Sequence, residues 1–292
     1  MKTVVEKHMT NFLNYAPYEV DLDTAKVVLI PVPYDGTTSY IAGARNGPEA
    51  ILRASAQLED YDLELDSDAS SQGIYTTSSL PIVADGPKQM IDSVENEVSK
   101  YIHKDKIVGV LGGEHSISLG VVRAFKKTYP NLSVLYLDAH SDMRQSYQGS
   151  LFSHGCTARR IMEHAPITLA GIRSLSQEEK EFISLSSIPI FPWPHDFHSN
   201  VDWTNKIVNT LKADVYVSID LDVLDPSIMP AVGNPEPGGI SWLELLSLLR
   251  VISETRNIVG FDVVELTPGQ ETESCSYLAA KLVYKLISYV VL

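Results

Sequence analysis

Residues 134–142 read Val-Leu-Tyr-Leu-Asp-Ala-His-Ser-Asp, an apolar run followed at once by Asp138, His140 and Asp142. A short run of branched and aromatic residues is typical of a strand that is buried on both faces. Two other stretches have the same design: residues 107–116 read IVGVLGGEHS, and residues 215–222 read VYVSIDLD. Parallel strands end at one edge of a sheet, where ligands bind in open α/β folds. The three polar clusters therefore predict a common site.

The rest of the chain alternates strand-length apolar runs with helix-length segments. The predicted strands are residues 27–31, 107–111, 133–137, 167–170, 188–191, 215–219 and 258–264. The predicted helices begin near residue 48 or cover residues 87–103, 116–129, 177–185, 201–212 and 242–254. This alternation predicts a three-layer α/β/α fold with a mainly parallel central sheet. We expect one domain over residues 1–292, with residues 61–79 as a surface excursion.

Composition excludes several classes of protein. The 292 residues carry 23 Lys and Arg against 37 Asp and Glu, a net charge of −14. This balance argues against nucleic acid as a partner and weakly favours a cationic ligand, although acidic surfaces more often serve solubility. Lys281 and Lys285 interrupt the apolar tail, whose apolar residues recur at helical spacing, so the tail predicts an amphipathic helix rather than a membrane span. Cys156 and Cys275 are far apart, and residues 1–18 lack signal-peptide architecture, so we expect a cytoplasmic protein.

The polar clusters favour a pair of metal ions. Side chains two residues apart in an extended chain point to the same side, so each cluster could aim its ligands at one point. Carboxylates that converge in a buried edge repel one another and lose solvation, and divalent cations remove that cost. Oxygen ligands with two imidazoles and no thiolate suit Mn²⁺ better than structural zinc. Six ligands are too many for one small ion but fit two ions that share carboxylates: His115, Asp138, His140, Asp142, Asp220 and Asp222.

Each cluster alone has a structural explanation. An Asp-x-Asp pair after a strand is usually a turn or helix cap, and glycines there commonly just admit the turn. The combination of all three clusters in one α/β chain favours the metal site.

The three clusters resemble the signatures of the ureohydrolase (arginase/agmatinase) family. They are Gly112-Gly113-Glu114-His115-Ser116, Asp138-Ala139-His140-Ser141-Asp142 and the run from Ser218 to Pro226. The likeness extends to Pro31–Gly36, Gly47–Ile51, Ser153-His154-Gly155 and Phe261–Glu265.

The resemblance implies an arginase-like fold, two Mn²⁺ ions and a homotrimer or homohexamer. It implies that one metal takes His115, Asp138, Asp142 and Asp220. The other would take His140, Asp138, Asp220 and Asp222, so that Asp138 and Asp220 bridge the pair.

The catalytic roles follow partly from chemistry and partly from the resemblance. A guanidinium carbon is a poor electrophile, so hydrolysis needs a strong nucleophile, and water between two dications becomes one. Glu265 could hold the guanidinium through paired charge-assisted hydrogen bonds, although a strand-end glutamate is more often a surface charge. The resemblance makes Asp142 a proton acceptor. His154 could carry a proton to the leaving amine or simply position the substrate.

The expected reaction releases urea and an amine from a small cationic guanidino compound. Agmatine, giving putrescine, is the favoured substrate. Residues 143–147 read MRQSY, without the Asn-containing stretch of arginases, and residues 235–239 read PEPGG, as in the agmatinase branch. Residues 231–234 (AVGN) and 274–276 (SCS) depart from that branch. Aminopropylagmatine, guanidinobutyrate and free guanidine therefore remain alternatives, the last with Ni²⁺.

Two alternatives from other classes remain. A catalytically silent homologue could act as a binding or scaffold protein, but the complete ligand set argues against it. A metal deacetylase of related topology would use one zinc, and paired bridging aspartates would then have no purpose.

Overall fold

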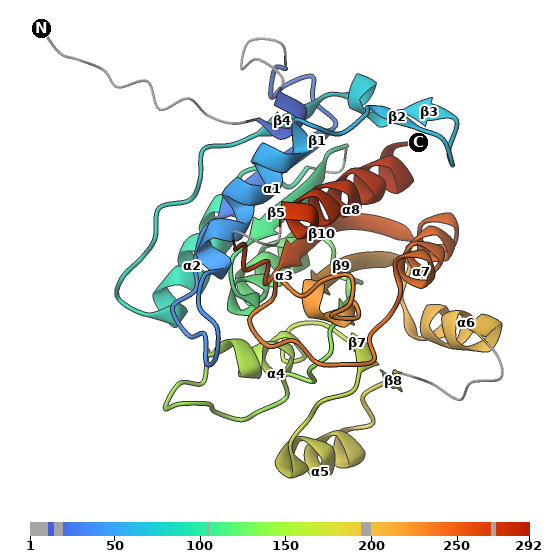
Figure 1. Ribbon diagram of the computed structural model, residues 1–292. Coiled ribbons are helices and arrows are strands. Elements are labelled where there is room, and N and C mark those ends of the chain that lie inside the picture. Colours follow the sequence, from blue (N-terminus) through green and yellow to red (C-terminus); the bar gives the residue numbers. More distant parts are fainter. Residues whose placement is uncertain (1–10, 15–19, 104, 194–199, 270–272) are drawn as a thin grey trace, which may run out of the picture.

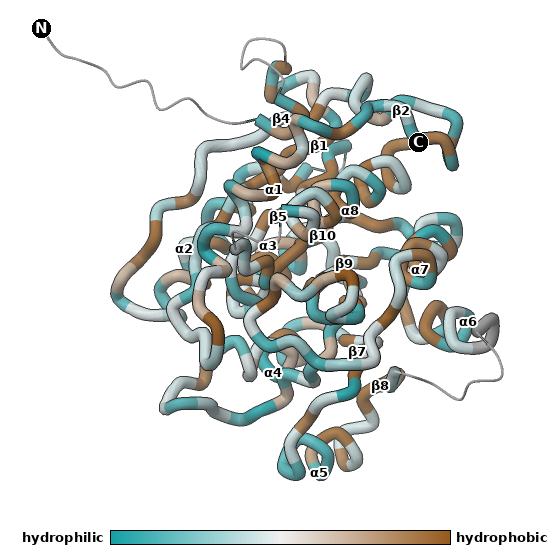
Figure 2. Tube along the Cα trace, in the orientation of Figure 1, coloured by the Kyte–Doolittle hydropathy of each residue, from teal (hydrophilic) through white to brown (hydrophobic). Residues whose placement is uncertain are grey.

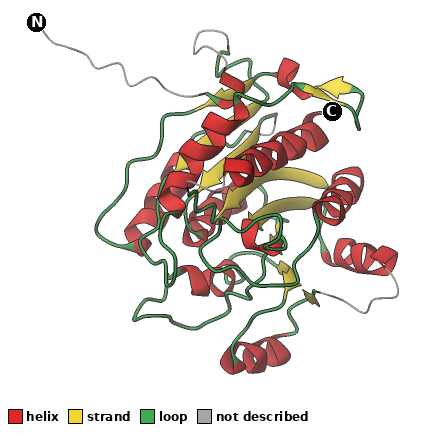
Figure 3. Ribbon diagram, in the orientation of Figure 1, coloured by secondary structure: helices red, strands yellow, loops and turns green. Residues whose placement is uncertain are grey.

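The computed structural model describes residues 11–14, 20–103, 105–193, 200–269 and 273–292. An eight-stranded sheet runs through its centre in the order β4-β1-β5-β10-β9-β6-β7-β8, and all neighbouring strands are parallel. Figures 1 and 3 show this sheet between layers of helices. The strands are β1 (Val27–Val32), β4 (Ile74–Thr76), β5 (Ile107–Gly112), β6 (Ser133–Leu137), β7 (Ile167–Ile172), β8 (Ile190–Pro192), β9 (Asp214–Asp220) and β10 (Asn257–Val264). The predicted α/β fold is confirmed.

Strand side chains alternate between two hydrophobic cores, one on each face of the sheet. Val27 and Leu29 of β1 belong to one core, whereas Val28 and Ile30 belong to the other. Both faces are covered, so the strands are continuously apolar, as the brown central strands of Figure 2 show. The first core packs against α1 (Gly47–Ser55), α6 (Asn200–Thr210), α7 (Trp242–Thr255) and α8 (Glu273–Val291). The second packs against α2 (Pro87–Val98), α3 (Ser118–Thr128), α4 (Thr157–Ile161) and α5 (Gln177–Ser186).

The segment at residues 61–79 differs from the prediction of a surface excursion. It contains the hairpin of β2 (Tyr61–Asp62) and β3 (Ser67–Asp68), and β4 then joins the edge of the main sheet beside β1. The apolar residues of β4 are too few to show a period, so its pairing with β1 decides its conformation. The sequence analysis also missed the helix α4, because its five residues are too few to show a helical period. Among the described residues, none of the helices combines the length and apolar composition needed to cross a bilayer.

Candidate metal centre and substrate pocket

Four adjacent strands in the middle of the sheet, β5, β10, β9 and β6, bring the predicted site residues together. His115 follows β5, Asp138 follows β6, Asp220 ends β9 and Glu265 follows β10. The turn after β5 requires glycine, because a Cβ on Gly113 would lie 1.8 Å from the carbonyl oxygen of Tyr34. The carboxyl edge of the sheet thus collects residues from four separate parts of the chain.

The Asp138–Asp142 segment reaches the site by turning rather than by continuing as a strand. The main-chain N–H of His140 donates to Asp138 Oδ1 over 2.6 Å, and that of Ala139 donates to Asp222 Oδ1 over 3.0 Å. Asp142 has φ 49°, in the left-handed region. The predicted convergence is present, but alternation along an extended chain is not its cause. Asp222 likewise lies in a 3₁₀ turn, where its N–H donates to Asp220 Oδ1 over 2.8 Å.

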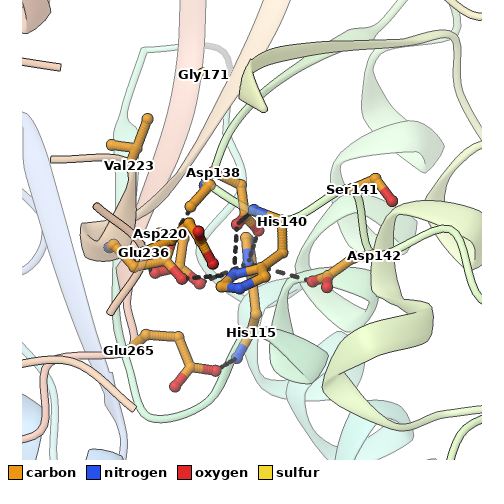
Figure 4. A network of polar contacts seen from close by, with 12 residues as sticks. His115, Asp138, His140, Ser141, Asp142, Gly171, Asp220, Val223, Glu236 and Glu265 are labelled. Carbon is orange, nitrogen blue, oxygen red and sulfur yellow. Dashed lines mark hydrogen bonds and ion pairs between the residues drawn. The ribbon is translucent and has the colours of Figure 1, made fainter. Parts of the chain in front are cut away.

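Two triads of side chains could each hold a cation. His115, Asp138 and Asp220 bring ligand atoms within 4.8 Å of one another, and so do Asp138, His140 and Asp222. Asp138 belongs to both triads, whereas Asp220 belongs only to the first. Asp142 lies beside the first triad, with Oδ2 3.8 Å from His115 Nδ1. Figure 4 shows Asp138, His140 and Asp220 turned toward a common point.

The donor atoms fit a divalent cation. Buried Asp138 Oδ2 has no hydrogen-bond donor among the described residues, although His115 Nδ1 lies 3.0 Å away. Asp220 Oδ2 lies 3.3 Å from the same nitrogen. Ser218 Oγ donates to Asp262 over 2.7 Å, so it can only accept from His115 Nε2, 2.9 Å away. Burial opposes the charge on His115, but Asp138 and Asp220 outweigh it and raise the pKa of His115 well above its ordinary value. Once a metal ion replaces one proton, the neutral ring would keep its proton on Nε2. The lone pair on Nδ1 would then face the two carboxylates and the Tyr136 hydroxyl, which is 2.9 Å away. Three lone-pair donors around one point suit a metal ion.

The cluster holds more negative charge than its histidines balance. Burial opposes the charge on His140, but Asp222 and Asp138 outweigh it and raise its pKa to about 12. Burial and the charge of Asp138 raise the pKa of Asp142 well above its ordinary value. Burial, Asp222 and Asp138 do the same to the pKa of Asp220. Without other cations the cluster therefore takes up protons, and divalent cations would replace them.

Tyr136 on β6 supports two of these groups. Its ring stacks on the His115 imidazole, with centroids 4.2 Å apart and planes 4° apart. Its hydroxyl donates to Asp142 Oδ2 over 2.8 Å. This fully buried tyrosine therefore holds a histidine and a carboxylate of the cluster in a fixed relation.

Arg173 binds the main chain behind Asp222. Its Nη2 donates to the carbonyl oxygens of Asp222 and Glu236, each over 2.7 Å. Its Nη1 donates to the carbonyls of Gly171 and Val223, over 3.3 and 3.2 Å. A planar guanidinium can join several carbonyls in this way. Arg173 thus ties the turn that carries Asp222 to the loop around Glu236.

Glu265 lies in the same pocket as the two triads. Its Oε1 accepts a hydrogen bond from the main-chain N–H of His115 over 2.7 Å, as Figure 4 shows. Its φ of 67° lies in the left-handed region, which is rare for a non-glycine residue and often marks a functional position. Burial and the charge of Glu114 raise the pKa of Glu265 to about 8.

His154 faces this pocket from the loop before α4. Burial, with the charges of His140 and His115, lowers the pKa of His154 to about 4, so the ring is neutral near neutral pH. Thr37 Oγ1 lies 3.2 Å from its Nδ1, and Ser39 Oγ lies 3.3 Å from its Nε2. His154 is therefore held by the loop that follows β1.

The structure brings all eight predicted residues into one pocket, whose volume is about 220 Å³. They are His115, Asp138, His140, Asp142, His154, Asp220, Asp222 and Glu265. The sequence analysis gave no role to Thr37, Glu114, Tyr136, Arg173, Ser218 and Asp262. Glu114, Ser218 and Asp262 stood inside quoted motifs, and Tyr136 stood inside a predicted strand. Thr37 and Arg173 carry no sequence pattern.

Known proteins are similar to this chain in sequence and in fold. A model of the arginase family matches residues 25–288. The N(1)-aminopropylagmatine ureohydrolase of Synechocystis sp. is 40% identical, over 91% of this chain and 89% of that protein. The agmatinase of Pyrococcus horikoshii is 37% identical, over 92% of this chain and 93% of that protein. The solved structure of the agmatine ureohydrolase of Thermoplasma volcanium matches with a TM-score of 0.87 and 32% identity, over 97% of this chain and 94% of that one. The chain therefore belongs to the arginase family.

Proposed function

We propose that this protein hydrolyses the guanidino group of a linear guanidino polyamine to urea and an amine, with N(1)-aminopropylagmatine as the preferred substrate and agmatine as the second. The observation that carries the proposal is the convergence of two His/Asp triads and Glu265 in one pocket. The site residues fit a pair of divalent cations, with Mn²⁺ expected.

The charge of the pocket supports a cationic substrate. Six carboxylates line it, against one arginine, Arg144. Arg144 is itself engaged, since its Nε lies 3.8 Å from Glu179 and its guanidinium lies 4.8 Å from the Tyr147 ring centroid. Two dications would offset four of the six negative charges. A guanidinium and a distal amine could then enter without meeting a free positive side chain.

The reaction needs water to give up both protons to the leaving nitrogen. Water and R–NH–C(NH₂)₂⁺ yield urea and R–NH₃⁺: a C–O bond forms, and the C–N bond to R–NH breaks with its electron pair on nitrogen. Two bound dications would lower the pKa of a water molecule toward neutrality and so supply the nucleophile. Glu265 would hold the planar cation by paired hydrogen bonds, and its carboxylate stands beside the triads.

Two side chains would move the protons. Asp142 would accept one from the attacking water, because its carboxylate stands next to the first triad. His154 would carry a proton to the leaving nitrogen, because its imidazole is neutral and lines the same pocket. Tyr136 would keep Asp142 in place through its hydrogen bond.

The choice between the two polyamines follows the relatives. The Synechocystis protein, named for N(1)-aminopropylagmatine, is 40% identical, while the Pyrococcus agmatinase is 37% identical. Agmatine, the substrate favoured from the motifs, thus becomes the second candidate. N(1)-aminopropylagmatine carries one more amine than agmatine, and the net charge of the chain, −14, is compatible with the added positive charge.

A urea-release assay tests the proposal. Agmatine, N(1)-aminopropylagmatine, guanidinobutyrate, arginine and guanidine are offered separately to the Mn²⁺-loaded and Ni²⁺-loaded chain. We expect the highest kcat/KM for N(1)-aminopropylagmatine with Mn²⁺. A higher kcat/KM for agmatine would reverse the order of the two polyamines, and equal values would remove the proposed preference. Urea from guanidine with Ni²⁺ alone, or no urea at all, would overturn the proposed function.

A further inference from the structure

Glu114, Thr37 and His154 form a chain of hydrogen bonds that ends at His154, which lines the pocket. The side chain of Glu114 is fully buried, directly before His115. Thr37 lies in the loop after β1, and His154 lies before α4. Three segments far apart in the sequence therefore meet at one side of the pocket.

The carboxylate of Glu114 receives three donors. The Thr37 main-chain N–H donates to Oε2 over 2.6 Å, and the Thr37 hydroxyl donates to Oε1 over 2.6 Å. The Ser116 hydroxyl also donates to Oε1, over 2.5 Å. Burial raises the pKa of Glu114, and the hydrogen bonds from Ser116 and Thr37 oppose this shift. As a carboxylate, Glu114 can only accept, so it sets the direction of all three hydrogen bonds. The single proton of the Thr37 hydroxyl therefore points at Glu114.

The remaining lone pairs of Thr37 Oγ1 face His154. The His154 main-chain N–H donates to Oγ1 over 2.9 Å, and His154 Nδ1 lies 3.2 Å from the same oxygen. Because Oγ1 has no proton left to give, Nδ1 must be the donor. Ser153 Oγ is farther from Nδ1, at 3.5 Å. A neutral imidazole with its proton on Nδ1 has a bare lone pair on Nε2.

We propose that Glu114, acting through Thr37, is a positioning residue that holds His154 as the Nδ1-protonated tautomer, so that Nε2 alone exchanges protons in the pocket. Ser39 Oγ, 3.3 Å from Nε2, can donate to this nitrogen before substrate arrives. The catalytic meaning of Nε2 rests on the proposed function, whereas the tautomer does not.

The tautomer matters because a carrier must first accept a proton. With a lone pair on Nε2, His154 accepts a proton that comes from the attacking water and forms an imidazolium. It then gives that proton to the leaving nitrogen as the C–N bond breaks, and returns to its starting state. With the proton on Nε2 instead, that nitrogen has no lone pair and cannot accept. A wrong tautomer would slow turnover without removing any group that holds the substrate.

The tautomer can be read directly by NMR on the full-length chain. The chain is labelled with ¹⁵N-histidine and loaded with diamagnetic Zn²⁺, and a His154→Gln sample identifies the His154 signals. The two nitrogens of a neutral ring differ in ¹⁵N shift according to which one carries the proton. We expect His154 to carry it on Nδ1 in the wild type and in Thr37→Ser. Thr37→Val removes the hydroxyl that faces His154 Nδ1 and donates to Glu114. In this variant we expect the proton to move to Nε2 in part or fully.

Kinetics with Mn²⁺ give the second readout. We expect kcat of Thr37→Val to fall about 10²-fold, the scale of general acid–base catalysis, with KM changed less than about threefold. Thr37→Ser should restore most of the rate, and all variants should bind two metal ions per chain. Thr38→Val, whose hydroxyl donates to the Asp35 carbonyl rather than to His154, should keep the Nδ1 tautomer.

Two results would overturn the inference. One is a wild-type His154 with its proton on Nε2, which needs no variant to observe. The other is a Thr37→Val chain that keeps both the Nδ1 proton and the wild-type kcat. Failure to release urea from every guanidino compound would instead count against the proposed function, since the tautomer is measured without substrate.

Discussion

Two clusters of buried charge in this molecule solve the same electrostatic problem in opposite ways. One surrounds Asp138 at the carboxyl edge of the sheet; we call it the edge cluster. The other joins Lys285 of α8 to Asp62 and Glu64 of the β2–β3 hairpin; we call it the hairpin cluster. The edge cluster buries several carboxylates, whereas the hairpin cluster buries Asp62 with Lys285 and leaves Glu64 at the surface. Each buried and unpaired charge costs several kcal/mol.

The hairpin cluster balances itself. Lys285, 4% exposed, donates from Nζ to both oxygens of Asp62, over 2.9 and 2.7 Å, and to Glu64 Oε2 over 2.6 Å. Arg250 Nη1 donates to Glu64 Oε1 over 2.7 Å, and the Tyr289 hydroxyl donates to Oε2 over 2.9 Å. Burial raises the pKa of Glu64, but these three partners outweigh it and lower the pKa below its ordinary value. Two acids thus meet two bases.

The edge cluster does not balance itself. Asp138 Oδ2 has no hydrogen-bond donor in the part of the chain that the structure describes. Burial and the charge of Asp138 raise the pKa of Asp142 well above its ordinary value, and burial, Asp222 and Asp138 do the same to the pKa of Asp220. Buried charge therefore does not by itself indicate a metal site. A metal site is indicated where the side chains present do not balance the buried negative charge.

The largest effect is expected for Asp138→Asn, which removes the carboxylate shared by both triads. We expect metal binding to weaken at both positions and kcat/KM to fall on the order of 10³-fold or more. Metal content by mass spectrometry and urea release measure this. Asp62→Asn, in the hairpin cluster, should keep its metal. Urea release near the wild-type rate from Asp138→Asn would show that the edge cluster does not need external cations.

The hairpin cluster should respond in stability alone. Lys285→Met leaves Asp62 and Glu64 without their shared cation, and we expect the free energy of unfolding to fall by about 3–5 kcal/mol. Urea denaturation with excess Mn²⁺ measures it. Adding Asp62→Leu should recover part of the loss, because the uncompensated charge is then gone. Loss of metal in folded Lys285→Met would mean that the two clusters are coupled.

The edge cluster should also make stability depend on pH through Glu265. Its pKa is about 8 in the folded chain against an ordinary 4.5. Between these values the folded state holds more protons than the unfolded state, so stability falls as pH rises. From about pH 5 to about pH 8.5, we expect the wild type to lose about 3 kcal/mol relative to Glu265→Gln. Urea denaturation of both proteins in a chelator gives the two curves, and parallel curves would contradict the raised pKa.

The smallest effect is expected from Arg173→Lys, which keeps the charge but loses the planar fork behind Asp222. We expect the affinity for one of the two metal ions to fall about tenfold, as for other supporting residues around metal ligands. Calorimetric titration with Mn²⁺ should resolve the two binding steps. Arg256→Lys is the matched control, since Arg256 also donates to main-chain carbonyls, those of Leu211, Thr255 and Val208. An equal loss in both variants would show that the effect is general.

The sequence predicted the cluster's members but not the geometry that brings them together. Alternation along extended chain suggested that Asp138, His140 and Asp142 share one side. The structure instead uses a turn that ends with Asp142 in the left-handed region, and it places Asp222 in a 3₁₀ turn. Such conformations are stabilised by main-chain hydrogen bonds to side chains from other strands, as from Ala139 to Asp222. No local pattern could encode them.

The supporting residues were missed for a related reason. Tyr136 fits the apolar pattern of its strand, so the sequence gives no sign that its hydroxyl donates to Asp142. Arg173 binds the carbonyl oxygens of Asp222 and Glu236, 49 and 63 residues away. Thr37 contacts Glu114 and His154, 77 and 117 residues away. A carbonyl oxygen has no sequence signature, and an isolated arginine or threonine is normally a surface residue.

The sequence by itself determined the parallel α/β sheet and the identity of the acid and imidazole residues at its edge. Apolar runs of strand length must be buried, and the polar clusters that follow them must then lie at the edge of the sheet. Only the tertiary structure decided which carboxylate is shared between the triads, which nitrogen of each histidine faces the pocket, and which charges remain without partners. Those outcomes depend on hydrogen bonds and electrostatic fields between segments that the fold alone brings within a few ångströms.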